Sequence, residues 1–335
     1  MTDAIEPGDI RIFSGRSHPE LAKGIADHLE IPLEKTYFSR FSNDNLFIQL
    51  GGSVRGRNVY LVQSLVSPVS EHLMELFMML DIARSAGARE VHAIIPYFSY
   101  ARSDKKNAPR ISITARLIAD LLQASGATHV MTMTLHSPQV HGFFSVPTDP
   151  LTARHLFVTH LRDAALDPND SVVIAPDYGR AASAGRLAIQ LGLPSLSAEK
   201  TRLTDTEVRI GELIVKQVMG FRRALIYDDE IATGGSVIEL CNMLIKSGVE
   251  EIRIVCTHGL LIGDAISRIS AIPQVVEIIT TNTVPIPQSK RLPKLAILNV
   301  APVFGEAIKR NYLRQSIGNL FAFWEEQFVA EDFQV

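Results

Sequence analysis

The sequence has few cysteines, no long hydrophobic run and almost no net charge, and each of these absences narrows what the protein can be. No apolar run reaches about 18 residues, the length at which a segment becomes a candidate membrane-spanning helix. No N-terminal segment combines a basic flank, an apolar stretch and a small-residue cleavage site, as a secretory leader does. We therefore expect a soluble, cytoplasmic protein that makes no membrane contact.

The two cysteines both occur in apolar segments. Cys241 falls in a predicted helix, Val237–Ile245, and Cys256 ends the apolar run Ile252–Cys256. We expect both to be reduced core residues, because free cysteine is commonly buried and cytosolic thiols stay reduced. The alternatives are a disulfide between them and a reactive thiol.

The near balance of charge indicates the class of partner. The chain has 33 basic and 36 acidic side chains, which gives a formal net charge of −3. Proteins that bind a phosphate backbone usually carry a clear basic excess. We therefore expect no nucleic acid as a partner, and small molecules or other protein subunits instead.

What the sequence does contain is a regular alternation of short β-branched runs and helix-period segments, over a length of 335 residues that suits about two domains. This alternation predicts an α/β fold with mostly parallel sheets flanked by helices. The predicted strands are Val59–Val62, Val91–Ile95, Val130–Thr134, Val172–Ala175, Ala224–Tyr227, Ile252–Cys256 and Val275–Thr280. The predicted helices between them include Leu73–Ala86, Ile113–Ala124, Ala181–Leu191 and Ser236–Lys246.

The two halves of the chain also resemble each other. In each half a strand, a loop and a helix are followed by a glycine, charged residues and a new strand, with the glycines at Gly87 and Gly248. A glycine in this place suits a left-handed helix end. The simplest interpretation is two similar α/β domains joined near Pro147–Arg154, and chance similarity of two strand–helix–strand units is the alternative.

The strongest chemical motif is the loop predicted after the strand Ala224–Tyr227, which reads Asp-Asp-Glu-Ile-Ala-Thr-Gly-Gly-Ser from Asp228 to Ser236. Its glycines let the backbone approach an anion, and the N–H groups of a helix start favour phosphate. Asp228 and Asp229 are suited to accept hydrogen bonds from vicinal sugar hydroxyls, directly or through Mg²⁺. The alternative is a solvated acidic turn with an ordinary helix cap at Ser236.

At this point the sequence resembles the phosphoribosyltransferase-type fold and, within it, the ribose-phosphate pyrophosphokinase family. The resemblance covers about residues 10 to 320. Besides the acidic loop, it rests on the motifs Phe13–Gly15, Arg40–Asn43, Ser53–Gly56, Pro96–Arg102, Leu135–Gln139, Gly142–Phe144 and Pro176–Asp177. It implies an N-terminal domain over 8–150 on the ATP side, a second domain over 151–305 with the ribose 5-phosphate loop, and a C-terminal helix and tail over 306–335 that packs back on the first domain.

The resemblance implies transfer of a diphosphoryl group from ATP to ribose 5-phosphate, with Mg²⁺ as cofactor. Taken alone, Arg102 suggests a surface ion pair, His136 a strand-end histidine, and Lys200 and Arg202 solvated cations. By resemblance Lys200 and Arg202 are catalytic, and His136 and Asp177 are metal-linked. The residues implied for ATP are Asn43, Asp44, Asn45, Arg102, Ser103 and Asp104, and those for ribose 5-phosphate are Arg202, Asp228, Asp229, Ala232, Thr233, Gly234, Gly235 and Ser236.

The chain departs from the family's usual pattern at several of these positions. Ala232 stands where the family usually has aspartate, and Asn45 where it usually has an acid. Ser103 replaces a common glutamine, and Tyr178 and Arg180 replace residues that are commonly histidine and glycine. These changes are compatible with two alternatives. The protein is an active enzyme whose site has adjusted, or it is an inactive relative of such enzymes.

Two further implications concern regulation and assembly. Ser53 and Arg55 resemble part of an allosteric phosphate and ADP site between subunits, and Ser316–Phe321 resembles its C-terminal part. The family implies a homo-oligomer, built from dimers and expected to be a hexamer. The alternatives to an active enzyme are a non-catalytic regulatory subunit and a phosphoribosyltransferase that consumes the diphosphate product.

Overall fold

The computed structural model describes residues 5–6, 8–164, 166–198, 200–202, 208–210 and 213–320, and for 200–202, 208–210 and 213 it describes the backbone alone. The chain forms two compact units, one from Met1–Thr152 with Val300–Val335 and one from Ala153–Asn299. In the part of the chain that the structure describes, no helix is long and apolar enough to cross a membrane.

The first unit is built on a six-stranded sheet in which every neighbouring pair is parallel, with the order β2-β1-β5-β6-β7-β8. Apart from the two-residue β2, its strands are almost entirely buried, as expected for a parallel sheet covered on both faces. They are β1 (Ile10–Ser14), β2 (Leu33–Glu34), β5 (Asn58–Val62), β6 (Glu90–Ile95), β7 (His129–Met133) and β8 (Thr148–Leu151).

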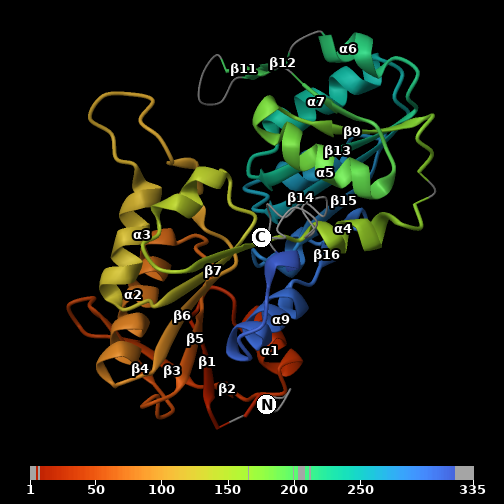
Figure 1. Ribbon diagram of the computed structural model, residues 1–335. Coiled ribbons are helices and arrows are strands. Elements are labelled where there is room, and N and C mark those ends of the chain that lie inside the picture. Colours follow the sequence, from red (N-terminus) through yellow and green to blue (C-terminus); the bar gives the residue numbers. More distant parts are fainter. Residues whose placement is uncertain are drawn as a thin grey trace, which may run out of the picture. The chain divides into compact units, whose positions relative to one another are not determined.

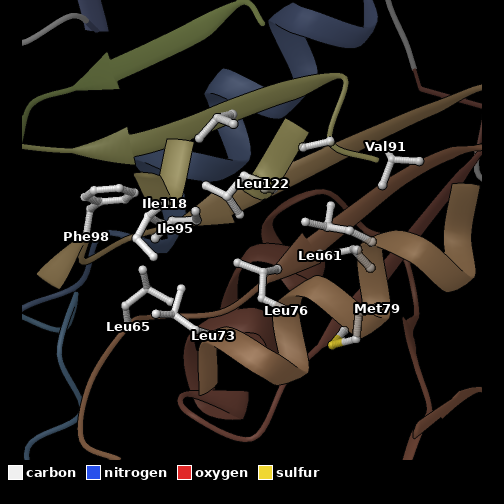
Figure 2. Close-up of a cluster of buried hydrophobic side chains, with 14 of the residues drawn as sticks. Leu61, Leu65, Leu73, Leu76, Met79, Val91, Ile95, Phe98, Ile118 and Leu122 are labelled. Carbon is white, nitrogen blue, oxygen red and sulfur yellow. The ribbon is translucent and has the colours of Figure 1, made fainter. Parts of the chain in front are cut away.

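Two helices cover each face of this sheet (Figure 1). Helices α2 (Val69–Ser85) and α3 (Thr114–Ser125) lie on one face, and α1 (Pro19–His28) and α9 (Ala301–Tyr312) pack together on the other. Figure 2 shows the core under α2 and α3, where strand residues such as Leu61 and Ile95 meet helix residues such as Leu76, Ile118 and Leu122. A separate antiparallel hairpin of β3 (Thr36–Arg40) and β4 (Leu46–Leu50) packs against α2.

The second unit repeats this architecture with the sheet order β10-β9-β13-β14-β15-β16, again parallel at every pair. Helices α4 (Arg154–Leu161) and α5 (Ala181–Leu191) pack together, while α7 (Gly235–Lys246) contacts α6 (Leu213–Val218) and α8 (Ala265–Ser270). The strands are β9 (Ser171–Ala175), β10 (Ser195–Ser197), β13 (Arg223–Ile231), β14 (Glu251–Gly259), β15 (Val275–Thr281) and β16 (Leu295–Leu298).

Both sheets therefore have the same strand order when each is numbered along its own half of the chain. Each unit also carries an antiparallel strand pair between its second and third sheet strands: β3 with β4, and β11 (Lys200–Arg202) with β12 (Val208–Ile210). The predicted fold class, two similar α/β domains with mostly parallel sheets, is confirmed. The glycines after α2 and α7 have the expected left-handed φ, +81° at Gly87 and +96° at Gly248.

All seven predicted strands and four predicted helices are present, but two strands run further than predicted. The prediction ended one at Tyr227 and the other at Cys256, whereas β13 continues to Ile231 and β14 to Gly259. The extra residues of the two strands stabilise each other, because Glu230 pairs with His258 and Ile231 pairs with Gly259. The prediction ended each strand where the apolar residues end, and the pairing between the two strands cannot be recognised from either segment alone.

The sheet strands β1, β2, β8, β10 and β16 and the antiparallel strands β3, β4, β11 and β12 were not predicted. Strands β2, β8, β10 and β16 have two to four residues, too few for a hydrophobic period to show. Strand β1 has five residues, as many as the predicted β5, so its length does not explain why it was missed. The expectation for the cysteines is confirmed: Cys241 and Cys256 are buried and free.

Candidate active site

Ligands of open parallel sheets bind outside the carboxyl ends of the strands, and the predicted sugar-phosphate residues lie at that edge of the second unit. Asp177 follows the end of β9, and Asp228 and Asp229 belong to the last part of β13. Strands β9 and β13 are neighbours in the sheet. The structure therefore brings Asp177 close to the acidic pair, although about 50 residues separate them in the chain.

The acidic pair corrects the prediction of a loop, because both residues lie in β13. The Asp229 side chain is only 3% exposed, and Asp228 is half-buried. The backbone N–H of Asp229 donates to Oδ1 of Asp228 over 2.8 Å. Burial, and then the adjacent Asp229 carboxylate, raise the pKa of Asp228 well above its usual range. The backbone of both aspartates is thus positioned by the sheet. Two adjacent carboxylates at this place require a nearby positive charge to stay ionised together.

The glycines that follow form the start of α7. Gly234 has a left-handed φ of +74° and is the N-cap, so the helix begins at Gly235 and the alternative of a cap at Ser236 is wrong. A Cβ on Gly234 would lie 2.9 Å from Cδ1 of Ile269, whereas a Cβ on Gly235 would meet no heavy atom within 4 Å. Open space at Gly235, together with the first N–H groups of a 12-residue helix, suits the approach of a phosphate.

The remaining loop residues lie between these two features. Thr233 is exposed, and Ala232 is half-buried. The carbonyl of Ala232 accepts the N–H of Ile262 over 2.9 Å, and that of Ile231 accepts the N–H of Leu261 over 3.0 Å. The segment after β14 therefore fixes the backbone of the loop before the helix starts.

Arg180 belongs to this site, although the sequence indicated it only as a departure from the family pattern. Its Nη1 lies 3.5 Å from Oδ2 of Asp229. Its backbone N–H donates to Oδ1 of Asp177 over 3.2 Å. Arg180 thus contacts Asp229, the predicted sugar residue, through its side chain, and Asp177, the predicted metal residue, through its backbone amide. No local pattern could show this, because the contact crosses between two strands.

Lys200 and Arg202 lie in β11, which pairs in antiparallel register with β12, Lys200 with Ile210 and Arg202 with Val208. Their side chains lie outside the described part of the chain. Their catalytic role therefore stays a prediction.

In the first unit, the predicted ATP residues follow the carboxyl end of β6. Arg102 is exposed at the end of a short 3-10 helix, Ser99–Arg102, and Ser103 and Asp104 are half-buried. The Ser103 hydroxyl accepts the N–H of Thr114 over 3.2 Å, at the first residue of α3. Ser103 thus positions α3, a role that the sequence did not indicate.

The end of the neighbouring strand β7 leads to His136, which is half-buried and lies three residues after Met133. The same sheet edge therefore carries Arg102 and His136. The predicted adenine contacts Asn43, Asp44 and Asn45 form the turn between β3 and β4 and are exposed. Asp44 has a φ of +68°, and its Oδ1 lies 2.8 Å from Nη1 of Arg40.

The predicted allosteric residues Ser53 and Arg55 lie at the opposite edge of this sheet, before the start of β5 at Asn58, and both are exposed. Leu320, from the predicted C-terminal part of the allosteric site, lies instead beside Thr152 after the end of β8, where its carbonyl accepts the Thr152 N–H over 2.9 Å. Phe321 lies outside the described residues. Ile317 of the same segment lines a cavity with Asn58 and Arg89, at the edge of the sheet that also carries Ser53 and Arg55. The allosteric role of both segments stays a prediction.

The donor set of the second unit fits a magnesium ion bound in the usual way for phosphate chemistry. Within the described ranges, no three or more His, Cys, Asp or Glu side chains cluster closely enough to hold a metal. Mg²⁺ is commonly held by one or two carboxylates plus substrate phosphates and water, so no such cluster is needed. Asp177 and Asp228 provide carboxylate oxygens of this kind at one sheet edge, whereas Asp229 is already paired with Arg180.

Comparisons with known proteins identify the family of the chain. A family model described as the N-terminal domain of ribose phosphate pyrophosphokinase matches residues 10–126, and one described as a phosphoribosyl synthetase-associated domain matches residues 196–322. A ribose-phosphate pyrophosphokinase of Deinococcus radiodurans is 45% identical over 92% of this chain and 97% of its own length. Another, of Caldanaerobacter subterraneus subsp. tengcongensis, is 38% identical over 93% and 98%.

A solved structure gives the same result. The crystal structure of phosphoribosylpyrophosphate synthetase from Mycobacterium smegmatis matches with a TM-score of 0.83 at 35% identity, and the match covers 91% of this chain and 99% of that one. Similarity at this identity and over this length extends to both units. The chain therefore belongs to the ribose-phosphate pyrophosphokinase family.

Proposed function

We propose that the protein is an active ribose-phosphate pyrophosphokinase that converts ATP and ribose 5-phosphate to AMP and 5-phosphoribosyl 1-diphosphate. The observation that carries the proposal is the edge of the second sheet, where buried acids of β13 meet the glycine start of α7. Carboxylates are suited to the sugar hydroxyls, and the N–H groups of the helix start are suited to the 5-phosphate.

In the proposed reaction the anomeric hydroxyl of the sugar attacks the β-phosphorus of ATP. The bond from the β-phosphorus to the oxygen that bridges it to the α-phosphorus breaks, AMP leaves with that oxygen, and the hydroxyl proton passes to solvent. Negative charge builds on the transferred diphosphate, and Lys200 and Arg202 stabilise it electrostatically. Asp228 and Asp229 orient the sugar.

Mg²⁺, when bound, neutralises charge on the phosphates. Asp177 and Asp228 would hold it in the second unit, and we keep the metal-linked role of His136 as a separate assignment in the first unit. Imidazole is an unusual magnesium ligand, because hard cations prefer oxygen. His136 would therefore act through a hydrogen bond to water or to a phosphate.

We place ATP at the carboxyl edge of the first sheet, on Arg102 and Asp104, with the hairpin turn at Asn43–Asn45 serving the adenine of a neighbouring subunit. This arrangement requires a homo-oligomer of at least two chains. The exposed position of the hairpin turn supports it, since a turn that pointed into its own core could not reach another subunit.

The test is formation of AMP from ATP and ribose 5-phosphate by the purified protein in the presence of Mg²⁺. We expect AMP and the sugar diphosphate to appear in equal amounts. No AMP would overturn the proposal, and binding of both substrates without turnover would favour the regulatory-subunit alternative. Lys200 and Arg202 are the residues that such a subunit would be free to lose, and both are present. Transfer of the phosphoribosyl group from the sugar diphosphate to a base, with pyrophosphate as the leaving group, would favour a phosphoribosyltransferase.

A further inference from the structure

A network of charged side chains connects the β3–β4 hairpin of the first unit to helix α2 and to the segment after β1. Arg16, in the segment after β1, donates its backbone N–H to Oε2 of Glu75 over 3.2 Å, and its guanidinium pairs with both Glu75 and Glu71. Glu71 also pairs with Arg40, the last residue of β3, with 2.6 Å between Oε1 and Nη2. One carboxylate in the first turn of α2 is therefore shared by two arginines from different segments.

The inner end of this network is fixed by burial. The Glu75 side chain is fully buried, and the Gln63 amide donates to its Oε2 over 2.8 Å. A buried carboxylate that loses its cation is strongly destabilising, so Arg16 is held at Glu75. The same guanidinium lies 5.4 Å from the ring centroid of Phe38 in β3, a distance that suits a cation–π contact. Exposed ion pairs alone contribute little, but Glu71 is paired with an arginine whose position is already fixed.

The outer end of the network reaches the turn of the hairpin. Nη1 of Arg40 donates to the carbonyl of Asp44 over 3.1 Å and lies 2.8 Å from Oδ1 of the same residue. Asp44 has a φ of +68°, which is uncommon for a residue other than glycine and persists where the surroundings hold it. Asp44 stands between Asn43 and Asn45, the other two residues proposed to serve the adenine. Arg40 therefore holds the central residue of the proposed adenine contact.

Apolar packing positions the strands of the hairpin, whereas its turn is exposed. Ile48 belongs to the buried core under α2, and Phe38 and Leu50 pack against that core. All five residues from 41 to 45 are exposed. Two backbone hydrogen bonds within the turn define its own shape. The direction of the turn relative to α2 then depends on the ion pairs of Arg40.

We propose that Glu71 is a positioning residue of the ATP site. Held by Arg16, its carboxylate orients Arg40, and Arg40 holds the turn in the direction that the adenine of a neighbouring subunit requires. This inference rests on the proposed function, because it assumes that the turn serves ATP. Its consequence is that loss of the Glu71 carboxylate weakens the use of ATP and leaves the chemical step and the sugar-phosphate site unchanged.

The first test is steady-state kinetics of the purified protein with Mg²⁺. Glu71→Ala should raise the KM for ATP at least about threefold, while kcat and the KM for ribose 5-phosphate stay within about twofold of wild type. Glu71→Asp keeps a carboxylate and should recover most of the effect. Asp120→Ala, which removes an exposed ion pair of α3, is the control and should change neither KM.

A double-mutant cycle tests whether Glu71 acts through Arg40. Arg40→Ala should raise the KM for ATP at least as much as Glu71→Ala does, because it also removes the contacts with Asp44. In the Arg40→Ala background, Glu71→Ala should add little, since two residues of one network are not additive. Additive effects would overturn the inference.

Hydrogen exchange tests the turn without any substrate. The N–H groups of Phe41 and Asp44 donate within the turn, and both should exchange faster in Glu71→Ala than in wild type. The amides of β5 should exchange as in wild type, which checks the fold. Unchanged exchange in the turn, or an unchanged KM for ATP, would overturn the inference. Loss of the oligomer in Glu71→Ala would also overturn it, because Glu71 would then support assembly. If wild type forms no AMP, the proposed function is wrong, and the exchange experiment still decides whether Glu71 positions the turn.

Discussion

Adjacent residues of the candidate site have different physical roles, and the two glycines at the start of α7 show this most clearly. Gly234 is required by its backbone, because an alanine at a φ of +74° is strained by about 1 to 2 kcal/mol. Gly235 has no such requirement and faces open space. We therefore expect the close approach of a phosphate to depend on the glycine at 235 and not on the one at 234.

We expect Gly234→Ala to lower the free energy of unfolding by roughly 1 kcal/mol or more. Gly235→Ala should leave unfolding nearly unchanged and weaken ribose 5-phosphate binding by about tenfold, since its methyl group occupies the space proposed for the phosphate. Denaturant unfolding and calorimetry of both variants measure the two effects. Full sugar-phosphate affinity in Gly235→Ala would mean that the anion binds elsewhere.

Lys200 is expected to act in the transition state. Lys200→Ala should lower kcat by at least about 100-fold, the scale seen when one preorganised charge-stabilising group is removed. The KM for ribose 5-phosphate should change much less, because the contact strengthens as charge develops. Steady-state kinetics measure both, and Lys216→Ala, at an exposed lysine of α6, is the control. An unchanged kcat would remove Lys200 from the mechanism.

The cysteines are expected to be chemically silent in the folded protein. Burial raises the pKa of Cys241 and of Cys256 to about 12, so neither forms a thiolate near neutral pH. A thiol reagent at about pH 8 should label neither cysteine in the native protein and both in denaturant. Rapid labelling without denaturant would show that one of them is accessible.

At the scale of the element, a buried histidine makes the first sheet sensitive to acid. His92 of β6 is stacked on Tyr60 of β5, with ring centroids 4.3 Å apart, and is 5.3 Å from the ring of His129 of β7. Its Nε2 lies 3.1 Å from the Glu90 carboxylate. Burial lowers the pKa of His92 despite that carboxylate, so the folded protein holds this ring neutral.

The unfolded chain then binds more protons than the folded one as the pH falls below the ordinary histidine value near 6.5. The contribution of the neutral His92 to stability is fully present above that value and is lost as the pH falls below it. We therefore expect the free energy of unfolding to decrease from pH 7.5 to pH 5.5. His92→Phe should reduce this decrease, while His28→Gln, at an exposed histidine, should not. Burial also lowers the pKa of His155, so some acid sensitivity should remain. Denaturant unfolding at both pH values decides, and an equal decrease in His92→Phe would contradict the assignment.

At the scale of the whole molecule, the two units share one sheet order but differ at the ligand edge. The second carries the acids and the glycine helix start, and the first carries Arg102 and His136. The hairpin of the first unit also exposes two aromatic residues, Phe41 and Phe47, 57% and 41% exposed and in edge-to-face contact with each other. Apolar exposure of this kind is consistent with the proposed contact between copies of the chain.

We therefore expect Phe47→Asp to reduce the oligomer and the affinity for ATP together, because the adenine site is proposed to need a second chain. Light scattering after size-exclusion chromatography gives the mass, and calorimetry gives the ATP affinity. Ile189→Asp, at an exposed position on α5, is the control for adding a charge to an apolar surface. A monomeric wild type, or a monomeric variant that binds ATP as wild type does, would contradict the shared site.

The sequence by itself was sufficient for most of the fold and for singling out the segment proposed to bind the sugar phosphate. Alternating β-branched and helix-period segments mark strands and helices locally, and the order of acids and glycines from Asp228 to Ser236 marks the site. The ends of β13 and β14 were missed, because a charged residue such as Glu230 stays in a strand only when a neighbouring strand pairs with it. Roles for Arg102, His136 and Lys200 came from resemblance, since single polar residues have no local signature.

Only the tertiary structure decided which side chains meet. Strand β9 lies next to β13, although β10, β11 and β12 come between them in the chain, and this crossover brings Arg180 to Asp229. Periodicity specifies the face of an element that is buried, and it contains no information about the neighbour across a crossover. The charge balance of the site was therefore set by the strand order, and an arginine that appeared as a departure from a pattern became the partner of the buried acid.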